Sequence, residues 1–461
     1  MQKVTITQQL SDLLPYQIEI GDNPDHIGGE GKIFFSLDNR YVVKIYNQPG
    51  PDKKNLLENV IKLGKNLGED AHLLAWPLGI VDKLDAEDCL GCVGLKVPSS
   101  HVNLTKLIYT RNEAIKQIQQ GRNWLDYLKI ARSIAAAVRT IHGKGMAHAD
   151  LHWKNFLVDI STGEAILIDL DGLVVKGFLP PQVKGVRGFI APEVEMGLAK
   201  PSEATDRHSA AVLILWTLLF RNVMEPQICY DAEDDNNDGI LGYGEKACFS
   251  EHPSDRRNWP PSIGLPLIRQ GFPSFKMLTP KLQELTEKTL IDGLHDAKKR
   301  PQVWQWEKAL AEAQDVTICC SHCEQSFIYP YWIHPAPRRH CPFCGTSVRS
   351  PRPVVLELLE EKTKGIYLPT RSIVLDRDRP LFVDTIERSQ IPPFNRDGLP
   401  ILGRTIWDAN KSIHCLISEN GTAWQLLTAG SGIIKCGKSV ELRRGLVLYF
   451  SDAKRLLRVV E

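Results

Sequence analysis

Residues 148–158 read HADLHWKNFLV, and residues 166–172 read ILIDLDG. The first stretch carries Asp150 and, five positions later, Asn155, while the second carries Asp169. Carboxylate and amide oxygens are the hard ligands that Mg²⁺ prefers, and this spacing presents Asp150 and Asn155 on one loop. We therefore expect a magnesium-dependent phosphoryl-transfer site, in which Asn155 and Asp169 bind the metal and Asp150 orients an attacking hydroxyl group.

The two stretches resemble the catalytic loop and the metal motif of eukaryotic-type protein kinases, which normally read HRDLxxxN and DFG. Near the N-terminus, residues 26–35 read HIGGEGKIFF and resemble the glycine-rich loop of the same family. Glycine lets backbone N–H groups approach phosphates closely, since a Cβ atom would obstruct them. The resemblance implies that ATP phosphates lie against Gly28, Gly29 and Gly31.

A strand is expected over residues 40–47, RYVVKIYN, whose alternation places Lys44 on the face opposite Val43 and Ile45. The resemblance implies that Lys44 binds the α- and β-phosphates of ATP and that an acidic residue on the next helix orients it. Glu58, in the helical stretch KKNLLENVIKLGK, is the candidate for that residue. The alternative is that Glu58 faces solvent, as charged helix residues usually do.

Three segments further along the chain fit the same family. The APE sequence at 191–193 resembles the end of an activation segment, and Arg300 in KKRP would pair with its glutamate, because a buried carboxylate needs a cationic partner. Residues 205–220 have the apolar density of a buried core helix, with Asp206 placed to hold the catalytic-loop backbone. An apolar run of about a dozen residues is too short to cross a bilayer.

Two positions depart from the family pattern. Ala149 replaces the arginine of HRD, and Asp171 stands where the glycine of DFG would be. Residues 172–190, which correspond to the activation loop, contain no serine, threonine or tyrosine. In kinases of the HRD type, that arginine responds to a phosphate on this loop. We therefore expect a kinase that is not switched on by phosphorylation of residues 172–190.

The residue that assists the transferred phosphate also differs. His152 occupies the place where serine/threonine kinases usually carry a lysine, and Lys154 is the candidate replacement, in an arrangement similar to some tyrosine kinases. The sequence favours a serine/threonine protein kinase but leaves the acceptor residue open. Because Lys44, Asp150, Asn155 and Asp169 are all present, active catalysis is the preferred interpretation. A pseudokinase or adaptor is the alternative.

Four cysteines form two Cys-x-x-Cys pairs, CSHC at 320–323 and CPFC at 341–344. This arrangement predicts a tetrahedral zinc site made by four thiolates. Such a site has no open coordination position, so the zinc would be structural and would stabilise a segment too short to fold on its own core. The predicted zinc ligands are Cys320, Cys323, Cys341 and Cys344.

Residues 354–461 run in short apolar, β-branched stretches separated by turn signals, and they predict a small all-β module. The segments ILGRT at 401–405 and KSIHCLI at 411–417 faintly resemble a forkhead-associated domain, which reads phosphothreonine. In that family Arg404 and Ser412 would contact phosphate. An interaction or scaffold module is the alternative.

The segment YDAEDDNNDGILGYGEKACF at 230–249 is strongly acidic. From Asp234 it matches a calcium-loop pattern, which requires a helix on each side. Pro226, Gly242 and Gly244 argue against such helices, so an acidic, solvated insertion is the favoured interpretation. The alternative calcium ligands are Asp234, Asn236, Asp238 and Glu245, with Gly239 at the turn.

The glycine-rich loop, the VVKIY strand, residues 251–260 (EHPSDRRNWP) and the cysteine pairs together resemble the bacterial kinases of TerY-P phosphorylation triads. That resemblance implies a TerY-like von Willebrand A protein as substrate and a metal-dependent phosphatase as counter-enzyme. The net charge of +1 argues against extensive binding to nucleic acid or to an anionic membrane. The first ten residues lack the apolar core of a signal peptide, so a cytoplasmic location is expected.

The expected fold class is α+β, with a bilobal protein-kinase-like fold followed by a zinc ribbon and a small all-β domain. The 461 residues leave room for several domains. The expected domains are an N-lobe at 1–98, a C-lobe at 99–315 with an acidic insertion at 230–260, a zinc ribbon at 316–350 and the β module at 354–461.

Overall fold

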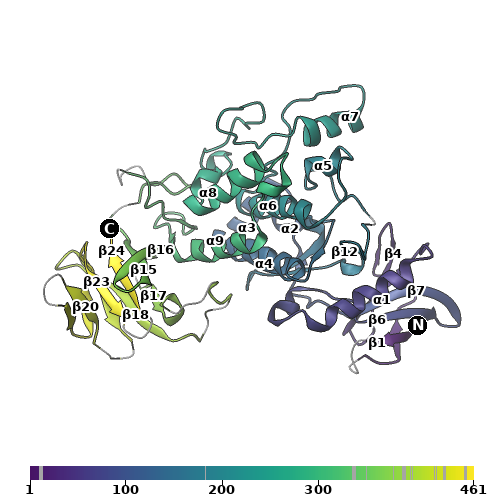
Figure 1. Cartoon of the computed structure of the whole chain (residues 1–461), viewed down its shortest axis with the longest axis horizontal. Coiled ribbons are helices and arrows are strands. Elements are labelled where there is room, and N and C mark those ends of the chain that lie inside the picture. Colours follow the sequence, from purple (N-terminus) through teal and green to yellow (C-terminus); the bar gives the residue numbers. More distant parts are fainter. Residues whose placement is uncertain are drawn as a thin grey trace. The chain divides into compact units, whose positions relative to one another are not determined.

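The chain has a mixed α/β structure that divides into two units, each built from segments that are not contiguous in the sequence (Figure 1). The computed structural model describes residues 1–9, 14–181, 183–334, 339–348, 350–376, 378–386, 391–394, 396, 398–419, 421, 423–428, 432–450 and 454–461. The first unit comprises residues 1–117, 130–260 and 285–304. The second unit comprises residues 118–129, 261–284 and 305–461.

The first unit begins with a seven-stranded antiparallel sheet in the order β2-β1-β6-β7-β5-β4-β3. Its strands alternate between buried and exposed residues, so that one face collects apolar side chains such as Val43, Ile45 and Val93. The strands are β1 (Gln2–Gln9), β2 (Gln17–Ile20), β3 (His26–Ile27), β4 (Gly31–Phe35), β5 (Tyr41–Tyr46), β6 (Gly79–Leu84) and β7 (Glu87–Leu95).

Helix α1 (Lys53–Leu63) packs against the other face of this sheet. Leu57 and Ile61 of α1 are buried in a cluster that also contains Tyr46 of β5 and Cys92 of β7. Cys92 lies inside a strand, and burial raises its pKa to about 12 with a further contribution from the charge of Asp171.

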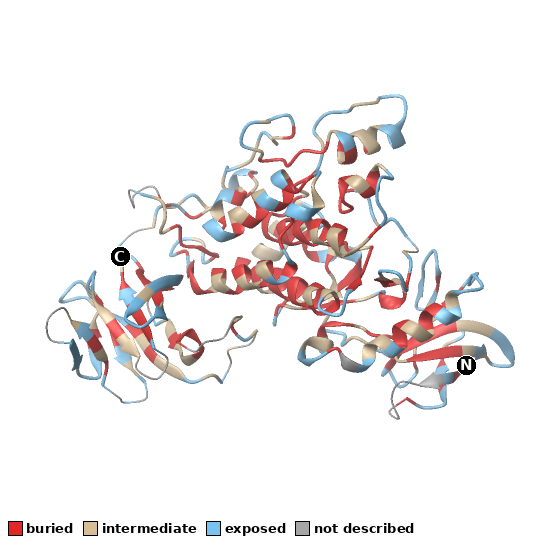
Figure 2. Ribbon diagram, in the orientation of Figure 1, coloured by how far each residue is buried: buried red, intermediate tan, exposed pale blue. Residues whose placement is uncertain are grey.

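The helical part of the first unit is organised around α6 (Glu203–Leu219), in which the residues from Thr205 onwards are buried except Arg207 (Figure 2). A helix that is apolar on all sides belongs in a core. Ser202 and Thr205 form a capping box at its N-terminus, which satisfies otherwise unpaired backbone N–H groups. Among the described residues, no helix is both long and apolar enough to span a membrane. The other helices of the chain are α2 (Thr105–Ile108), α3 (Arg111–Gln119), α4 (Trp124–His142), α5 (Pro192–Glu195) and α7 (Asp235–Ile240), together with α8 (Pro280–Glu287) and α9 (Val303–Asp315), which lie mostly in the second unit.

Two small sheets in this part carry the segments between α4 and α5. One has the order β11-β10-β8 and the other pairs β12 with β9, all antiparallel. The short strands fix where the intervening loops begin and end. The strands are β8 (Val102–Asn103), β9 (Met146–Ala147), β10 (Phe156–Asp159), β11 (Glu164–Leu167) and β12 (Val174–Val175).

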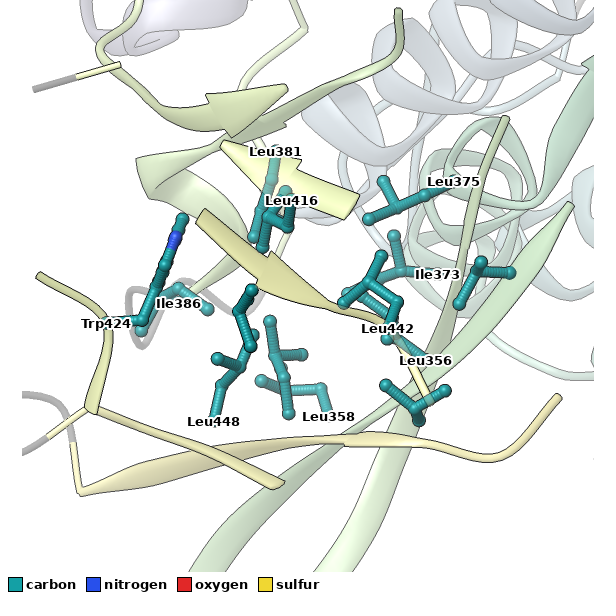
Figure 3. Close-up of a cluster of buried hydrophobic side chains, with 14 of the residues drawn as sticks. Leu356, Leu358, Ile373, Leu375, Leu381, Ile386, Leu416, Trp424, Leu442 and Leu448 are labelled. Carbon is teal, nitrogen blue, oxygen red and sulfur yellow. The ribbon is translucent and has the colours of Figure 1, made fainter. Parts of the chain in front are cut away.

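The second unit ends in two antiparallel sheets that enclose an apolar core. Figure 3 shows Leu356, Leu358, Ile373 and Leu375 converging with Leu448 and Trp424 between the strands. A six-stranded sheet contains β16 (Ile366–Leu375), β15 (Val354–Thr363), β24 (Arg455–Val459), β23 (Val447–Phe450), β20 (Gln425–Thr428) and β21 (Gly432–Lys435). A four-stranded sheet contains β17 (Pro380–Phe382), β18 (Ile401–Asp408), β19 (Ile413–Ser418) and β22 (Ser439–Glu441).

Asp315, the last residue of α9, is a buried centre of charge in the second unit. Its carboxylate contacts Arg396 Nη1 at 2.5 Å and Arg371 Nη1 at 3.4 Å. Arg379 donates to the carbonyl oxygens of Gln314 and Thr317 on either side of Asp315. Burial alone would raise the pKa of Asp315. The charges of Arg396 and Arg371 lower this pKa by a larger amount, so the carboxyl stays ionised. This cluster joins α9 to the β strands.

Arg339 makes a second buried connection in this unit, and it is 1% exposed. Its guanidinium donates to Glu461 Oε1 at 2.5 Å and Oε2 at 2.9 Å, and to the Tyr329 hydroxyl at 2.6 Å. It also donates to the carbonyl oxygens of Ile333 and Tyr331. The cysteine-rich segment is thus tied to Glu461, two residues after the end of β24.

Candidate active site

The loop between β9 and β10 carries the central residues of the candidate site, and Asp206 of α6 holds its backbone. Asp206 accepts hydrogen bonds from the backbone N–H groups of His148 at 2.7 Å and Ala149 at 3.1 Å. Ala149 has a φ of +69°, a left-handed conformation that L-residues rarely adopt. Buried hydrogen bonds of this kind can maintain such a conformation, and they direct the next residue, Asp150.

Asp150 and Asn155 are adjacent in space. Asn155 Nδ2 donates to the Asp150 carbonyl oxygen at 2.9 Å and lies 3.4 Å from its Oδ2. His152 Nδ1 accepts from the Lys154 backbone N–H, so its proton is on Nε2 and is donated to Asp150 Oδ2 at 3.3 Å. Among the described residues Asp150 Oδ1 has no hydrogen-bond partner, so it is the oxygen left to accept a hydroxyl proton.

The electrostatics keep Asp150 ionised. Burial alone would raise the pKa of the Asp150 carboxyl. The hydrogen bond and the charge of His152 lower this pKa by a larger amount, so the pKa is below its ordinary value. An ionised carboxylate can accept or orient a proton. His152 therefore supports Asp150 from the position that the family gives to a lysine.

Asp169 lies beside this loop because the two motifs are hydrogen-bonded to each other. Ile168 N–H donates to the Asn155 carbonyl oxygen at 2.9 Å, and His148 Nε2 lies 3.1 Å from the Ile168 carbonyl oxygen. Asp169 itself has a φ of +63°. Backbone strain of this kind clusters at functional sites, where surrounding contacts maintain it.

Lys44 of β5 contacts Asp169 from the seven-stranded sheet. Its Nζ lies 2.7 Å from Asp169 Oδ1, 3.1 Å from Asp171 Oδ2 and 3.2 Å from Glu30 Oε2. Burial alone would lower the pKa of Lys44, but the charges of Asp171 and Asp169 outweigh it and the pKa is raised. The oxygens of Glu30, Asp169 and Asp171 lie within 4.8 Å of one another, so they could also hold a metal ion.

Asp171 is the most buried of these three carboxylates, and it has further donors. Lys53 Nζ, at the start of α1, lies 3.3 Å from Asp171 Oδ2, and the Tyr46 hydroxyl donates to the same oxygen. Burial raises the pKa of Asp171, but the charges of Lys44 and Lys53 lower it far below its ordinary value. Burial and the charge of Asp171 together raise the pKa of Asp169.

The expected contact between Lys44 and Glu58 differs from what the structure contains. Among the described residues, the carboxylates within salt-bridge distance of Lys44 are those of Glu30, Asp169 and Asp171, and Glu58 is partly exposed on α1. Lys53, and not Glu58, is the α1 residue that contacts the cluster. Five residues correspond to about 140° around a helix, so Lys53 and Glu58 face different directions.

The glycine-rich hairpin joins β3 and β4, and its glycines have different surroundings. A Cβ on Gly31 would lie 2.3 Å from the Ile45 carbonyl oxygen, so this glycine is required by the close approach of β4 to β5. Around Gly29 nothing lies within 4 Å of such a Cβ, and Gly28 has one contact at 3.7 Å. The Gly28 N–H donates to the Gly31 carbonyl oxygen at 2.9 Å, so Gly29 offers the open backbone that a phosphate would need. Glu30 lies between Gly29 and Gly31 and reaches Lys44.

Lys154 lies in the same 3-10 turn as Asn155, Trp153–Asn155, and its side chain is exposed. Its carbonyl oxygen accepts a hydrogen bond from Asn103 Nδ2 at 2.7 Å, which fixes the turn. Lys154 is four residues after Asp150 in the sequence, and its side chain extends into solvent. This position is compatible with the expected contact between Lys154 and the transferred phosphate.

The segment after Asp171 is held at its far end. Arg300 is buried and donates to Glu193 Oε1 at 2.7 Å and Oε2 at 2.8 Å. Just before Glu193, Phe189 packs against Trp153 and Trp216, with ring centroids 4.4 Å and 5.2 Å away, and the two tryptophan rings are themselves 4.5 Å apart. The segment therefore ends in a fixed position beside the Asp150 loop.

The four predicted zinc ligands form a separate candidate metal centre. The sulfur atoms of Cys320, Cys323, Cys341 and Cys344 lie within 4.8 Å of one another, and the pairs 320–344 and 323–341 are each 3.7 Å apart. A tetrahedron with Zn–S bonds of about 2.3 Å requires about 3.8 Å between sulfurs. The group could therefore bind a metal such as zinc.

Two matching turns position these sulfurs. Glu324 N–H donates to the Cys320 carbonyl oxygen at 3.0 Å, and Gly345 N–H donates to that of Cys341 at 2.8 Å. Both Glu324 and Gly345 have positive φ values, +59° and +77°. The first turn connects β13 (Thr317–Cys319) with β14 (Ser326–Ile328). The two Cys-x-x-Cys pairs are thus equivalent structures.

Residues 235–240 form helix α7, whereas the calcium-loop pattern would require an open loop at these positions. The alternative of a calcium loop is therefore wrong. Asp234 caps this helix by accepting from the N–H groups of Asn236 and Asn237. Asp238 Oδ1 accepts from two backbone N–H groups, and Glu245 pairs with Lys246. One oxygen of each of these carboxylates is therefore bonded within the segment, and Asn236 Oδ1 accepts from Arg187.

Sequence reasoning did not assign roles to Asp171, Lys53 and Tyr46 in the site. The one signal was the unusual Asp171 itself, a carboxylate where the family has glycine. A buried carboxylate needs cationic or hydroxyl partners. That requirement indicates that lysines such as Lys44 and Lys53 contact Asp171, although they lie far from it in the sequence. Their identity depended on the packing of α1 against the sheet.

Comparison with known proteins supports a distant relationship to protein kinases. The chain is 28% identical over 124 residues to a dual serine/threonine and tyrosine protein kinase of Apis mellifera, which covers 27% of this chain and 12% of that protein. It is 26% identical over 182 residues to the serine/threonine-protein kinase PknD of Chlamydia muridarum, which covers 33% of this chain and 18% of that protein. The chain therefore spans less than a fifth of the length of these relatives. No family model matches it.

Proposed function

We propose that the chain is an ATP-dependent protein kinase that phosphorylates serine or threonine on a partner protein. The observation that carries this proposal is the meeting of Lys44 with Asp169 at 2.7 Å, beside a loop that holds Asp150 and Asn155 together. A lysine for the phosphates, two oxygen ligands for Mg²⁺ and a carboxylate for the hydroxyl are what phosphoryl transfer requires. The distant similarity to protein kinases supports the same function.

In this function the residues have distinct tasks. Lys44 binds the α- and β-phosphates, with Gly29 offering a backbone N–H group, while Gly28 and Gly31 shape the hairpin through their own hydrogen bond. Asn155 and Asp169 would hold Mg²⁺, which supplies charge neutralisation on the transferred phosphoryl group. Asp150 Oδ1 accepts or orients the hydroxyl proton while His152 holds Oδ2. The antiparallel sheet with α1, followed by the helical part, supports a bilobal kinase fold for this proposal.

The test is phosphate transfer from ATP by the 461-residue chain, measured by autophosphorylation and on a general protein substrate. Asp150→Ala and Asp169→Asn are expected to lower the rate by at least about a hundredfold, since general-base and metal roles are each of this size. Lys184→Ala, an exposed lysine outside the site, is the control. Equal activity in all four proteins would reject the proposal. Phosphoamino-acid analysis distinguishes serine or threonine from tyrosine.

An adaptor without catalysis is the second candidate. It is favoured by the direct salt bridges between Lys44 and three carboxylates, a charge arrangement that is complete without nucleotide. An adaptor would present the cysteine-rich segment and the β strands of the second unit to partners. Nucleotide binding without any phosphate transfer, in the presence of the physiological partner, would favour it over the kinase.

The proposed partners rest on the resemblance to TerY-P triad kinases. They are a von Willebrand A protein as substrate and a metal-dependent phosphatase, in the cytoplasm. Examination of neighbouring genes, followed by phosphorylation of the encoded von Willebrand A protein, tests this directly. A neighbourhood without either gene would contradict the triad assignment while leaving the kinase assay unaffected.

A further inference from the structure

Asp171 occupies a position with an unusual number of positively charged and hydroxyl donors. Its two oxygens receive Lys44 Nζ at 3.2 and 3.1 Å, Lys53 Nζ at 3.3 Å and the Tyr46 hydroxyl. The residue is 4% exposed. A buried carboxylate with this many donors is fixed in place, because moving it would leave two ammonium groups without a counter-charge.

The three carboxylates around Lys44 are not equivalent. Glu30 is exposed on the hairpin, and its side chain is free to leave. Asp169 is the residue that the proposed function assigns to the metal, and a bound cation would compete with Lys44 for its oxygens. Asp171 remains as the partner that can keep Lys44 in position when nucleotide and metal are both bound.

We infer that Asp171 is the positioning residue for Lys44, in place of an acidic residue on α1, and that Lys53 connects α1 to this pair. This inference rests on the proposed function, since orienting Lys44 matters when Lys44 binds phosphates. In the arrangement expected from the family, the helix supplies a carboxylate to the lysine. Here the polarity is reversed, because α1 supplies an ammonium group and the segment after Asp169 supplies the carboxylate.

The reversed arrangement has a mechanical consequence. Asp171 is two residues after Asp169, so the residue that orients Lys44 and the proposed metal ligand move as one segment. Displacement of α1 would remove Lys53 but leave the direct contact between Lys44 and Asp171. Movement of α1 should therefore affect the site less than movement of residues 169–172.

A role of Asp171 as a second metal ligand is the competing interpretation. Its oxygens lie within 4.8 Å of those of Glu30 and Asp169. Against this, the same oxygens are already occupied by Lys44, Lys53 and Tyr46. A metal would have to displace ammonium groups, whereas the positioning role requires no rearrangement.

The test compares Asp171→Asn with Glu58→Gln in the 461-residue chain, two substitutions that each replace a carboxylate by its amide. We expect Asp171→Asn to lower kcat at saturating Mg²⁺ and ATP by about 10- to 100-fold, the cost of a misplaced catalytic group. We expect Glu58→Gln to stay within about threefold of the wild type. Asp171→Glu, which keeps the charge, should recover part of the loss. The Mg²⁺ concentration for half-maximal activity should be unchanged in Asp171→Asn.

A second measurement does not depend on catalysis. Hydrogen exchange of the backbone amides of residues 53–57, without nucleotide, should be faster in Asp171→Asn than in the wild type. If the wild type transfers no phosphate, the proposed function fails while this measurement still tests the connection between α1 and Asp171. Lys53→Met removes the same connection from the α1 side and leaves the Asp171 carboxylate with Lys44 and Tyr46, so it replaces Asp171→Asn if that variant does not fold.

Three results would overturn the inference. The first is a loss in Glu58→Gln as large as that in Asp171→Asn. The second is recovery of Asp171→Asn by excess Mg²⁺, which would assign Asp171 to the metal. The third is hydrogen exchange of α1 that is the same in Asp171→Asn, or in Lys53→Met, as in the wild type.

Discussion

Arg187 donates hydrogen bonds to both the side-chain oxygen and the carbonyl oxygen of Asn236, at 3.0 and 3.4 Å, across 49 positions of sequence. Arg187 also contacts Glu195 of α5 at 2.7 Å. The acidic insertion thus packs against the segment that follows Asp171, although its composition predicts only a solvated loop. The contact attaches residues 183–190, which contain no serine, threonine or tyrosine, to α5 and α7.

Replacing Arg187 by alanine should loosen residues 183–190 and lower phosphate transfer by about 10-fold, because the segment loses two charge-assisted contacts. Lys184→Ala removes an exposed positive charge from the same segment and should leave both properties unchanged. Hydrogen exchange of residues 183–190 and the transfer rate are the measurements. Identical exchange in the two variants would show that α7 does not support this segment.

The Arg300–Glu193 pair should be important for stability. Arg300→Ala leaves Glu193 and three carbonyl groups without their donor, and we expect unfolding to become easier by about 3–5 kcal/mol. Lys299→Ala, next to it and exposed, should change stability by less than about 0.5 kcal/mol. Denaturant titration followed by circular dichroism measures both. A small effect of Arg300→Ala on the free energy of unfolding would mean that the surrounding residues rearrange to fill the space left by the Arg300 side chain.

The cysteine cluster should hold one metal ion per chain. Cys341→Ser is expected to abolish zinc binding, since it removes one of four thiolates, while Cys319→Ser, an exposed neighbour outside the cluster, should leave it intact. Elemental analysis of the purified proteins gives the stoichiometry. Because Asn123 and Trp124 bond to Glu324 and Gln325, zinc removal should also speed amide exchange at the start of α4. Normal zinc content in Cys341→Ser would contradict the assignment.

Asp315 makes the acid stability of the second unit predictable. Its folded-state pKa lies below the ordinary value of 3.8, so its contribution to stability is complete above about pH 3.8 and is lost as the pH falls through the lower folded-state pKa. Asp315→Asn should cost about 3–5 kcal/mol near pH 7, because buried arginines lose their counter-charge.

The same variant should show a shallower loss of stability below pH 3.8 than the wild type, which is measured by denaturant titration at a series of pH values. Glu357→Gln, which breaks the more exposed ion pair with Arg458, is the control and should cost at most about 1 kcal/mol. Parallel pH profiles for wild type and Asp315→Asn would rule out this source of the acid sensitivity.

The parts of the site that the sequence could predict depend on local spacing. Asp150 and Asn155 lie on one loop, and the four cysteines come together, because in both cases a short segment fixes the ligands. The strand carrying Lys44 also follows the alternation of its residues. These features require little knowledge of tertiary packing.

The parts that could not be predicted depend on distant contacts. Lys44 and Asp171 are 127 positions apart, and the choice of Asp171 over Glu58 is set by how α1 is rotated on the sheet. The calcium pattern failed for a related reason. Its spacing matched, but Asp234 forms a helix cap that uses the oxygens locally, and a cap and a metal loop favour the same residue types.

Trp153, Phe189 and Trp216 form a cluster in which each ring contacts the other two, with centroids 4.4, 4.5 and 5.2 Å apart. One ring comes from the Asp150 loop, one from the segment just before α5 and one from α6. Three elements that lie far apart in the sequence are therefore coupled through one aromatic cluster, and a change in the packing of Phe189 acts directly on the loop that carries Asp150.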